Sequence, residues 1–168
     1  MIADVVASAQ ELVSQQFPEG AEDTSDWLEG VPQIGARAAF APIAVFESLH
    51  ETPADYDGTA WRLWEEAFHG FEEQRQEAVA ALAAKWGPPQ SHSFRPEHDR
   101  VWAGDESVSK LEYDLAMFTG GEPFPAWRHG SRIIALLLGQ MDKEFPIVLT
   151  LAALTMPDQA SEGGAADR

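Results

Sequence analysis

The sequence predicts an α+β fold in which helices pack on an antiparallel meander. Apolar residues recur at helical spacing from residue 59 to residue 86, and the run Gly-Pro-Pro at 87–89 ends this pattern. After Pro89 the apolar spacing changes from 3.6 residues to two, and short links between the apolar runs favour hairpins. We therefore expect one long amphipathic helix at about 59–86, packed on three to five antiparallel strands at about 90–155.

The chain before residue 59 is predicted to begin with a helix. Residues 2–17 carry apolar side chains at helical spacing, which indicates an amphipathic helix. Residues 18–32 form an acidic loop that contains Trp27. The next apolar segment contains Pro42, which breaks a continuous helix, so we expect only a short helix over 42–49.

The helix at 59–86 is the longest predicted element, roughly 42 Å at 1.5 Å per residue. Its large apolar residues fall within a sector about 100° wide, as expected for a helix face that lies on a core. These residues are Trp61, Trp64, Phe68, Phe71, Ala78, Val79, Leu82 and Trp86.

Four segments after Pro89 are predicted strands. The segment 109–118, SKLEYDLAMF, alternates apolar and polar residues, and a short strand is expected at 100–103. Segments 132–140 and 145–154 are apolar on both sides, as in covered central strands.

A strand that is apolar on both sides needs a cover on each face of the sheet. The long helix covers one face, and either the segment 32–49 or a second copy of the chain is expected to cover the other. We expect a single globular domain over 1–156, followed by a mobile polar tail at 157–168.

The composition is acidic, with a formal net charge of −17. Residues 1–58 hold eleven acidic residues against the single base Arg37. This charge repels nucleic-acid phosphates, so we expect no binding to nucleic acid. The acidity fits either a well-solvated surface or a surface that attracts a basic partner. No apolar run is long enough for a membrane helix and no secretory signal is present, so we expect a cytoplasmic protein that binds no membrane.

The residue types present in the sequence exclude several kinds of catalytic and metal-binding site. The absence of cysteine excludes disulfides, thiolate metal sites and cysteine nucleophiles. Glycine-rich phosphate loops, Gly-x-Ser-x-Gly and His-Glu-x-x-His are also absent. We therefore predict no catalytic residues, no bound metal and no cofactor.

Three histidines offer an alternative, metal-binding or acid–base site. His69 has glutamates three and four residues away on both sides, including Glu65 and Glu72, and this favours a protonated imidazole in an ion-pair network. The spacing Glu-x-x-His at 66–69 occurs in di-iron bundles, but those sites need a second copy of it. His92 and His98 could form a metal site with one glutamate of the helix at 59–86, but only if the loop that carries them folds back onto that helix.

The leading hypothesis is a non-catalytic protein that binds a basic protein partner, as an inhibitor, immunity protein or chaperone does. An aromatic residue surrounded by carboxylates is typical of a binding hot spot. The alternatives are a metal-assisted hydrolase that uses the histidines and glutamates above, and a self-associating subunit that forms a homodimer. The predicted partner-binding residues are Asp23, Asp26, Trp27, Glu29, Asp55 and Asp57.

Overall fold

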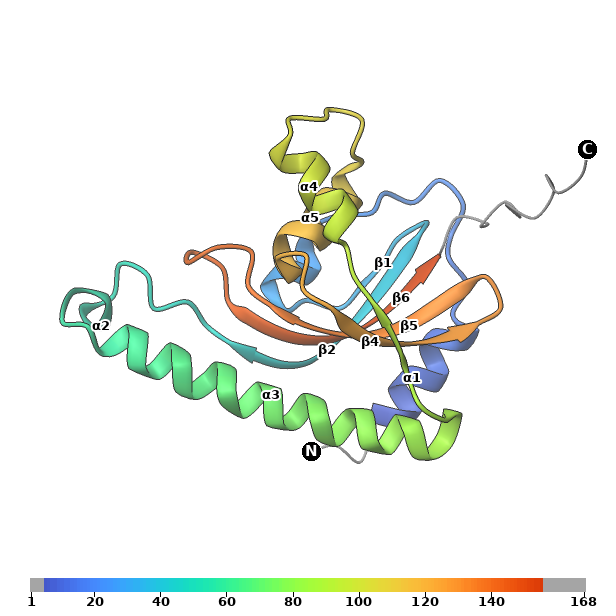
Figure 1. Ribbon diagram of the computed structural model, residues 1–168, viewed down its shortest axis with the longest axis horizontal. Coiled ribbons are helices and arrows are strands. Elements are labelled where there is room, and N and C mark those ends of the chain that lie inside the picture. Colours follow the sequence, from blue (N-terminus) through green and yellow to red (C-terminus); the bar gives the residue numbers. More distant parts are fainter. Residues whose placement is uncertain (1–4, 156–168) are drawn as a thin grey trace, which may run out of the picture.

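The computed structural model describes residues 5–155, which form one mixed α+β unit around a six-stranded antiparallel sheet (Figure 1). The strand order is β1-β2-β6-β5-β4-β3. The α+β class is confirmed, with six strands where three to five were expected. The elements are α1 Val5–Ser14, η2 Asp26–Glu29, β1 Gln33–Ile34, β2 Ala38–Phe46, α2 Pro53–Tyr56, α3 Thr59–Trp86, β3 Gln90–His92, α4 Arg95–Trp102, α5 Lys110–Thr119, β4 Phe124–His129, β5 Arg132–Gly139 and β6 Ile147–Thr155.

The centre of the sheet is the hairpin of β5 and β6. Its register pairs Leu136 with Leu151, and β6 also pairs with β2 on its other edge. Every residue from Ile133 to Gly139 and from Ile147 to Leu154 is buried. The two strands predicted from their continuous apolar runs are confirmed.

Two layers cover this sheet. Helices α1 and α3 pack on one face, where Leu12 and Leu82 contact residues of β5 and β6. The opposite face is covered by η2 and α5, through Trp27, Leu115 and Phe118. The segment 32–49 was one candidate for this second cover. It supplies β1 and β2 of the sheet instead.

Helix α3 begins and ends where the sequence predicts. The Asp57 side chain accepts a hydrogen bond from the Thr59 backbone N–H (2.9 Å), which satisfies one of the free donors of the first turn. Gly87 follows the last turn with φ of 81°, a conformation that favours glycine. The indole of Trp127 then donates to the Gly87 carbonyl (2.8 Å), which ties this helix end to β4.

The predicted helix at 42–49 is wrong, because the segment forms β2. Proline blocks a sheet hydrogen bond as well as a helical one, but a β-bulge tolerates it. The register of β2 against β6 shifts between Pro42 and Ala44, so Ile43 is the extra residue of such a bulge.

The two predicted strands at 100–103 and 109–118 are also wrong, because α4 and α5 occupy this region. The Ser109 hydroxyl accepts from the Glu112 N–H, and the Glu112 carboxylate accepts from the Ser109 N–H, which is a complete capping box. Leu111, Leu115 and Phe118 then recur at helical spacing and are buried. Local capping thus selects a helix where the polar alternation suggested a strand.

Within residues 5–155, no helix combines the length and the apolar character needed to cross a membrane. The tail expected at 157–168 lies outside the described residues.

The first prediction concerns Gly139, at the end of β5. A β-carbon at this position would lie 2.1 Å from the Phe118 carbonyl oxygen, at the end of α5. Gly139→Ala therefore forces the sheet and α5 apart, and we expect it to lower the free energy of unfolding by about 2 kcal/mol or more.

Gly70 is the matched control, since a β-carbon there meets no other part of the described chain within 4 Å. Gly70 lies within α3, so Gly70→Ala should raise the free energy of unfolding by about 0.5–1 kcal/mol. Urea denaturation of both variants tests this contrast. Equal effects of the two substitutions would contradict the tight contact between Gly139 and α5.

Candidate functional site

Trp27 is a core residue. Its side chain is fully buried, stacks on Phe40 with ring centroids 4.2 Å apart, and meets Phe118 edge to face at 4.9 Å. The prediction that Trp27 is exposed as an anchor for a partner is therefore wrong. The loop before η2 is pinned to the sheet by this side chain.

The predicted partner-binding acids do not share one surface. Asp23 binds Arg37 (3.2 Å) and Asp57 caps α3, so both act within the fold. Asp26 and Glu29 are exposed on η2, which packs beside α5, whereas Asp55 lies on α2 at the far end of α3 (Figure 1). The six residues therefore divide between two separate regions.

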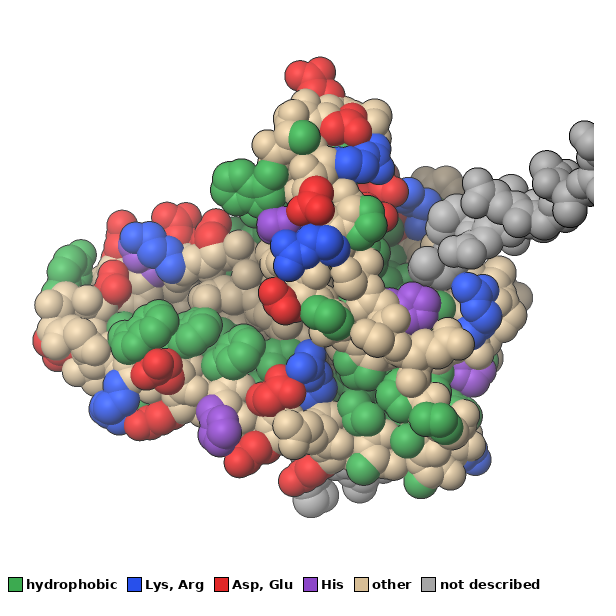
Figure 2. All heavy atoms as spheres, viewed as in Figure 1, with side chains coloured by type: hydrophobic (Ala, Val, Ile, Leu, Met, Phe, Trp, Pro, Cys, Tyr) green, Lys and Arg blue, Asp and Glu red, His purple; other side chains and the backbone are tan. Residues whose placement is uncertain are grey.

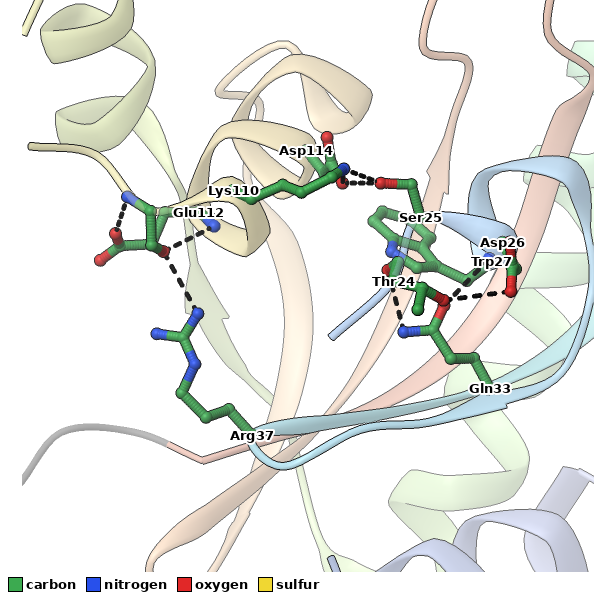
Figure 3. Close-up of polar contacts among 10 residues, drawn as sticks. Thr24, Ser25, Asp26, Trp27, Gln33, Arg37, Lys110, Glu112 and Asp114 are labelled. Atoms are coloured by element: carbon green, nitrogen blue, oxygen red, sulfur yellow. Dashed lines mark hydrogen bonds and ion pairs between the residues drawn. The ribbon is translucent and has the colours of Figure 1, made fainter. Parts of the chain in front are cut away.

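A polar cluster joins the η2 region to α5 (Figure 3). The Ser25 hydroxyl donates to the carboxylate of buried Asp114 (2.5 Å), and Lys110 binds both Ser25 and Asp114. The Ser25 hydroxyl is thus held between the Asp114 carboxylate and the Lys110 ammonium, and the cluster fastens the segment before η2 to α5.

The histidines named in the sequence do not converge. His69 is exposed and lies 3.4 Å from Glu73, its neighbour one turn away. His92 lies on β3, where burial and the charge of Arg128 lower its pKa, and His98 accepts a hydrogen bond from Trp102 (3.1 Å). Within residues 5–155, no three His, Asp or Glu side chains are placed to hold a metal ion.

The most unusual surface of the described chain follows the N-terminal half of α3. The rings of Trp61 and Trp64 stack with centroids 5.2 Å apart, and Trp64 stacks on Phe68 at the same distance. We call these three residues the aromatic ladder. Figure 2 shows hydrophobic side chains in a row along this part of α3, bordered by acidic ones. Trp61 is 64% exposed, which is uncommon for the largest side chain in proteins.

A groove runs beside the aromatic ladder. It consists of two hollows, of about 360 and 450 Å³, which share Trp64 and Gln140. The larger hollow separates α3 from the C-terminal end of α5. Gln140 lies at the boundary between the two hollows. Its side chain is held in place there, because it accepts a hydrogen bond from the Trp64 indole (2.8 Å) and donates one to the Phe145 carbonyl (2.8 Å).

His50 lies in the lining of the smaller hollow and is surrounded by carboxylates. Its ring nitrogens lie 3.4 Å from Asp55, 3.6 Å from Glu144 and 3.7 Å from Glu51. The side chain is only 18% exposed, and Nδ1 is buried without a hydrogen bond to any described residue. Three segments of the chain therefore meet at one imidazole.

The conformation around His50 is also constrained. Glu51 has φ of 58°, a left-handed conformation that costs free energy in a residue with a side chain. Asp55 accepts a hydrogen bond from the Glu51 N–H (3.1 Å), which holds this turn. Ser48 binds the Lys143 carbonyl (2.5 Å), so the turn is also fastened to the β5–β6 loop.

The sequence named the ladder residues but assigned them to the core. Their helical spacing correctly identified the face of α3 that points toward the sheet. The spacing of these residues does not show that the sheet covers the N-terminal half of α3 incompletely. Glu51 and Asp55 are close to His50 in the sequence, so the sequence already suggests these two contacts. Glu144 is far from them along the chain and reaches His50 only through the tertiary fold.

Comparisons with protein families, with curated proteins and with solved structures found no match to this chain.

The capping box of α5 gives the second prediction. Burial alone would raise the pKa of Glu112, but hydrogen bonds from Ser109, together with the charges of Arg100 and Arg37, outweigh burial and hold the pKa below its usual value. Because the folded-state pKa lies below the unfolded value of about 4.3, this group stabilises the fold above that pH. The stabilisation is lost as the pH falls through the folded-state pKa.

Ser109→Ala removes the hydroxyl that caps the helix. We expect it to lower the free energy of unfolding by about 1 kcal/mol at neutral pH and by less near pH 3. Urea denaturation at the two pH values measures the difference. Ser131→Ala, in the exposed turn between β4 and β5, is the control. A deficit for Ser109→Ala that grows on acidification would contradict this account.

Proposed function

We propose that this protein is a non-catalytic binding protein that holds a basic, partly apolar segment of a protein partner in the groove beside the aromatic ladder. The exposed stack of Trp61 and Trp64 is the observation that carries this proposal. An inhibitor, an immunity protein or a chaperone would use such a groove.

The aromatic ladder supports an apolar contribution to binding. Large aromatic side chains contribute most of the binding energy in many protein interfaces, and they do so where partners exclude water around them. The groove offers this setting, because Phe68 and Trp64 form one wall and the connection after α5 forms the other. A peptide side chain placed between these walls would bury apolar surface on both sides.

The local charge supports a basic partner. Residues 38–58 contain Glu47, Glu51, Asp55 and Asp57 and no lysine or arginine. Lys143 is the one basic residue other than histidine in the lining of the smaller hollow, within the described chain. A cationic segment would therefore approach an attractive field, which raises association rates at low salt.

The alternatives have less support. A metal-assisted hydrolase would need His69, or His92 with His98, to meet a glutamate such as Glu65 or Glu72 at a metal site, and within residues 5–155 no three such side chains are placed to hold a metal ion. Self-association was motivated by an uncovered face of the central strands, but both faces of β5 and β6 are buried within the described chain.

The third prediction tests the groove with an array of twelve-residue peptides of graded net charge. We expect binding of the purified protein to rise with positive charge and with aliphatic content, and to fall at high salt. The variant Glu47→Gln/Glu144→Gln should bind the basic peptides more weakly, because Glu47 lines the smaller hollow and Glu144 lies 3.6 Å from His50 in its lining.

The matched control is Glu11→Gln/Glu19→Gln, which removes the same charge at exposed positions outside the groove. This control separates the effect of position from that of net charge. Equal losses in the two double variants, or strongest binding to neutral peptides, would contradict the proposal.

A further inference from the structure

We propose that the smaller hollow is a receptor for a single lysine or arginine side chain of the partner, which would bind between the Trp61 ring and the Asp55 carboxylate. The inference rests on the proposed function and names the chemistry that the groove recognises. It concerns the hollow between the turn at 46–50, α2 and the first turns of α3.

The hollow is large enough for one long side chain. Its volume of about 360 Å³ lies at the lower end of the range of roughly 300–1,000 Å³ typical of pockets that hold a small-molecule ligand. Phe46, Leu49 and Trp64 contribute apolar surface to the lining. Such walls suit the methylene groups of lysine or arginine, which pack on apolar surface while the charged end reaches polar groups.

Trp61 provides a place for the cation. Stacking on Trp64 occupies one face of its ring, and the side chain remains 64% exposed, so the opposite face is open to a ligand. A lysine ammonium or an arginine guanidinium is attracted to the face of an indole ring. Arginine can also stack its planar group on this surface.

Asp55 provides the negative charge. Its side chain is 39% exposed and lines the same hollow as Trp61. The contacts of its carboxylate with Glu51 N–H and with His50 both use Oδ2. None of its contacts within residues 5–155 uses Oδ1, so this oxygen can accept a hydrogen bond from an incoming cation.

The charged residues of the hollow favour a cation. Its lining contains the carboxylates of Glu47 and Asp55 and one ammonium group, that of Lys143, while the α3 residues of the hollow are uncharged. Lys143 therefore opposes the binding of a second cation, and the two carboxylates favour it.

The fourth prediction uses fluorescein-labelled octalysine and the same peptide with every side chain acetylated. We expect the wild-type protein to bind octalysine and not the acetylated peptide, measured by fluorescence anisotropy. Asp55→Asn removes the charge and keeps an oxygen that can accept the Glu51 N–H. It should weaken binding about fivefold. Trp61→Leu keeps apolar volume and removes the ring, and it should also weaken binding about fivefold.

Two further variants complete the test, and circular dichroism checks the folding of each. Asp26→Asn, an exposed aspartate on η2, should bind like the wild type. Lys143→Ala should bind more tightly, because it removes the lysine of this hollow.

The outcomes separate this inference from the proposed function. Octalysine binding that is equal in wild type, Asp55→Asn and Trp61→Leu, yet weaker in Glu47→Gln/Glu144→Gln, would overturn the side-chain receptor and leave the groove as the binding surface. Equal binding of the acetylated peptide would also overturn the receptor. If no basic peptide of the array binds either, the proposed function fails as well.

Discussion

The burial of β5 and β6 on both faces is the constraint on which the rest of this structure depends. Ile134 and Leu136 point toward α1 and α3, while Ile133 and Leu137 point toward η2 and α5. Burying this much apolar surface is the main source of stability in a domain of this size. Both helical layers must therefore close on the sheet. The contact of Gly139 with the end of α5 shows how close one of these layers comes.

The groove is a consequence of a mismatch between α3 and this sheet. A 28-residue helix is roughly 42 Å long, whereas a nine-residue strand such as β6 spans about 30 Å. The buried residues of α3 are Ala78 and Leu82, in its C-terminal half. The N-terminal half carries the same apolar face to a region that the sheet covers incompletely. There Trp64 and Phe68 pack against a smaller cluster around Leu138 and Ile147, while Trp61 is exposed.

The sequence predicted the elements whose signals are local and long, and it failed where tertiary contacts decide. The helix over 59–86 and the two central strands were correct because their periodicity and end signals agree. The alternation of polar and apolar residues after Ser109 predicts a strand, but the capping box that Ser109 forms with Glu112 starts a helix there. Pro42 was read as a helix breaker, although a bulge in β2 accommodates it. Trp27 has no sequence feature that reveals its stacking on Phe40 from a distant strand.

The acidic residues of this chain serve several purposes, and net charge alone does not identify a binding surface. Asp23 and Asp57 stabilise turns, Glu112 caps α5, and Asp114 fastens η2 to that helix. Hydrogen bonds from Ser107 and Arg100 likewise hold the pKa of Asp105 well below its usual range. Such carboxylates already have partners, and another cation would have to displace them. The acids beside Trp61 differ because they border a hollow with an exposed aromatic ring. In the proposed site an incoming cation would gain the ring face and the charge together, which favours the start of α3 over the N-terminal acidic loop as the binding surface.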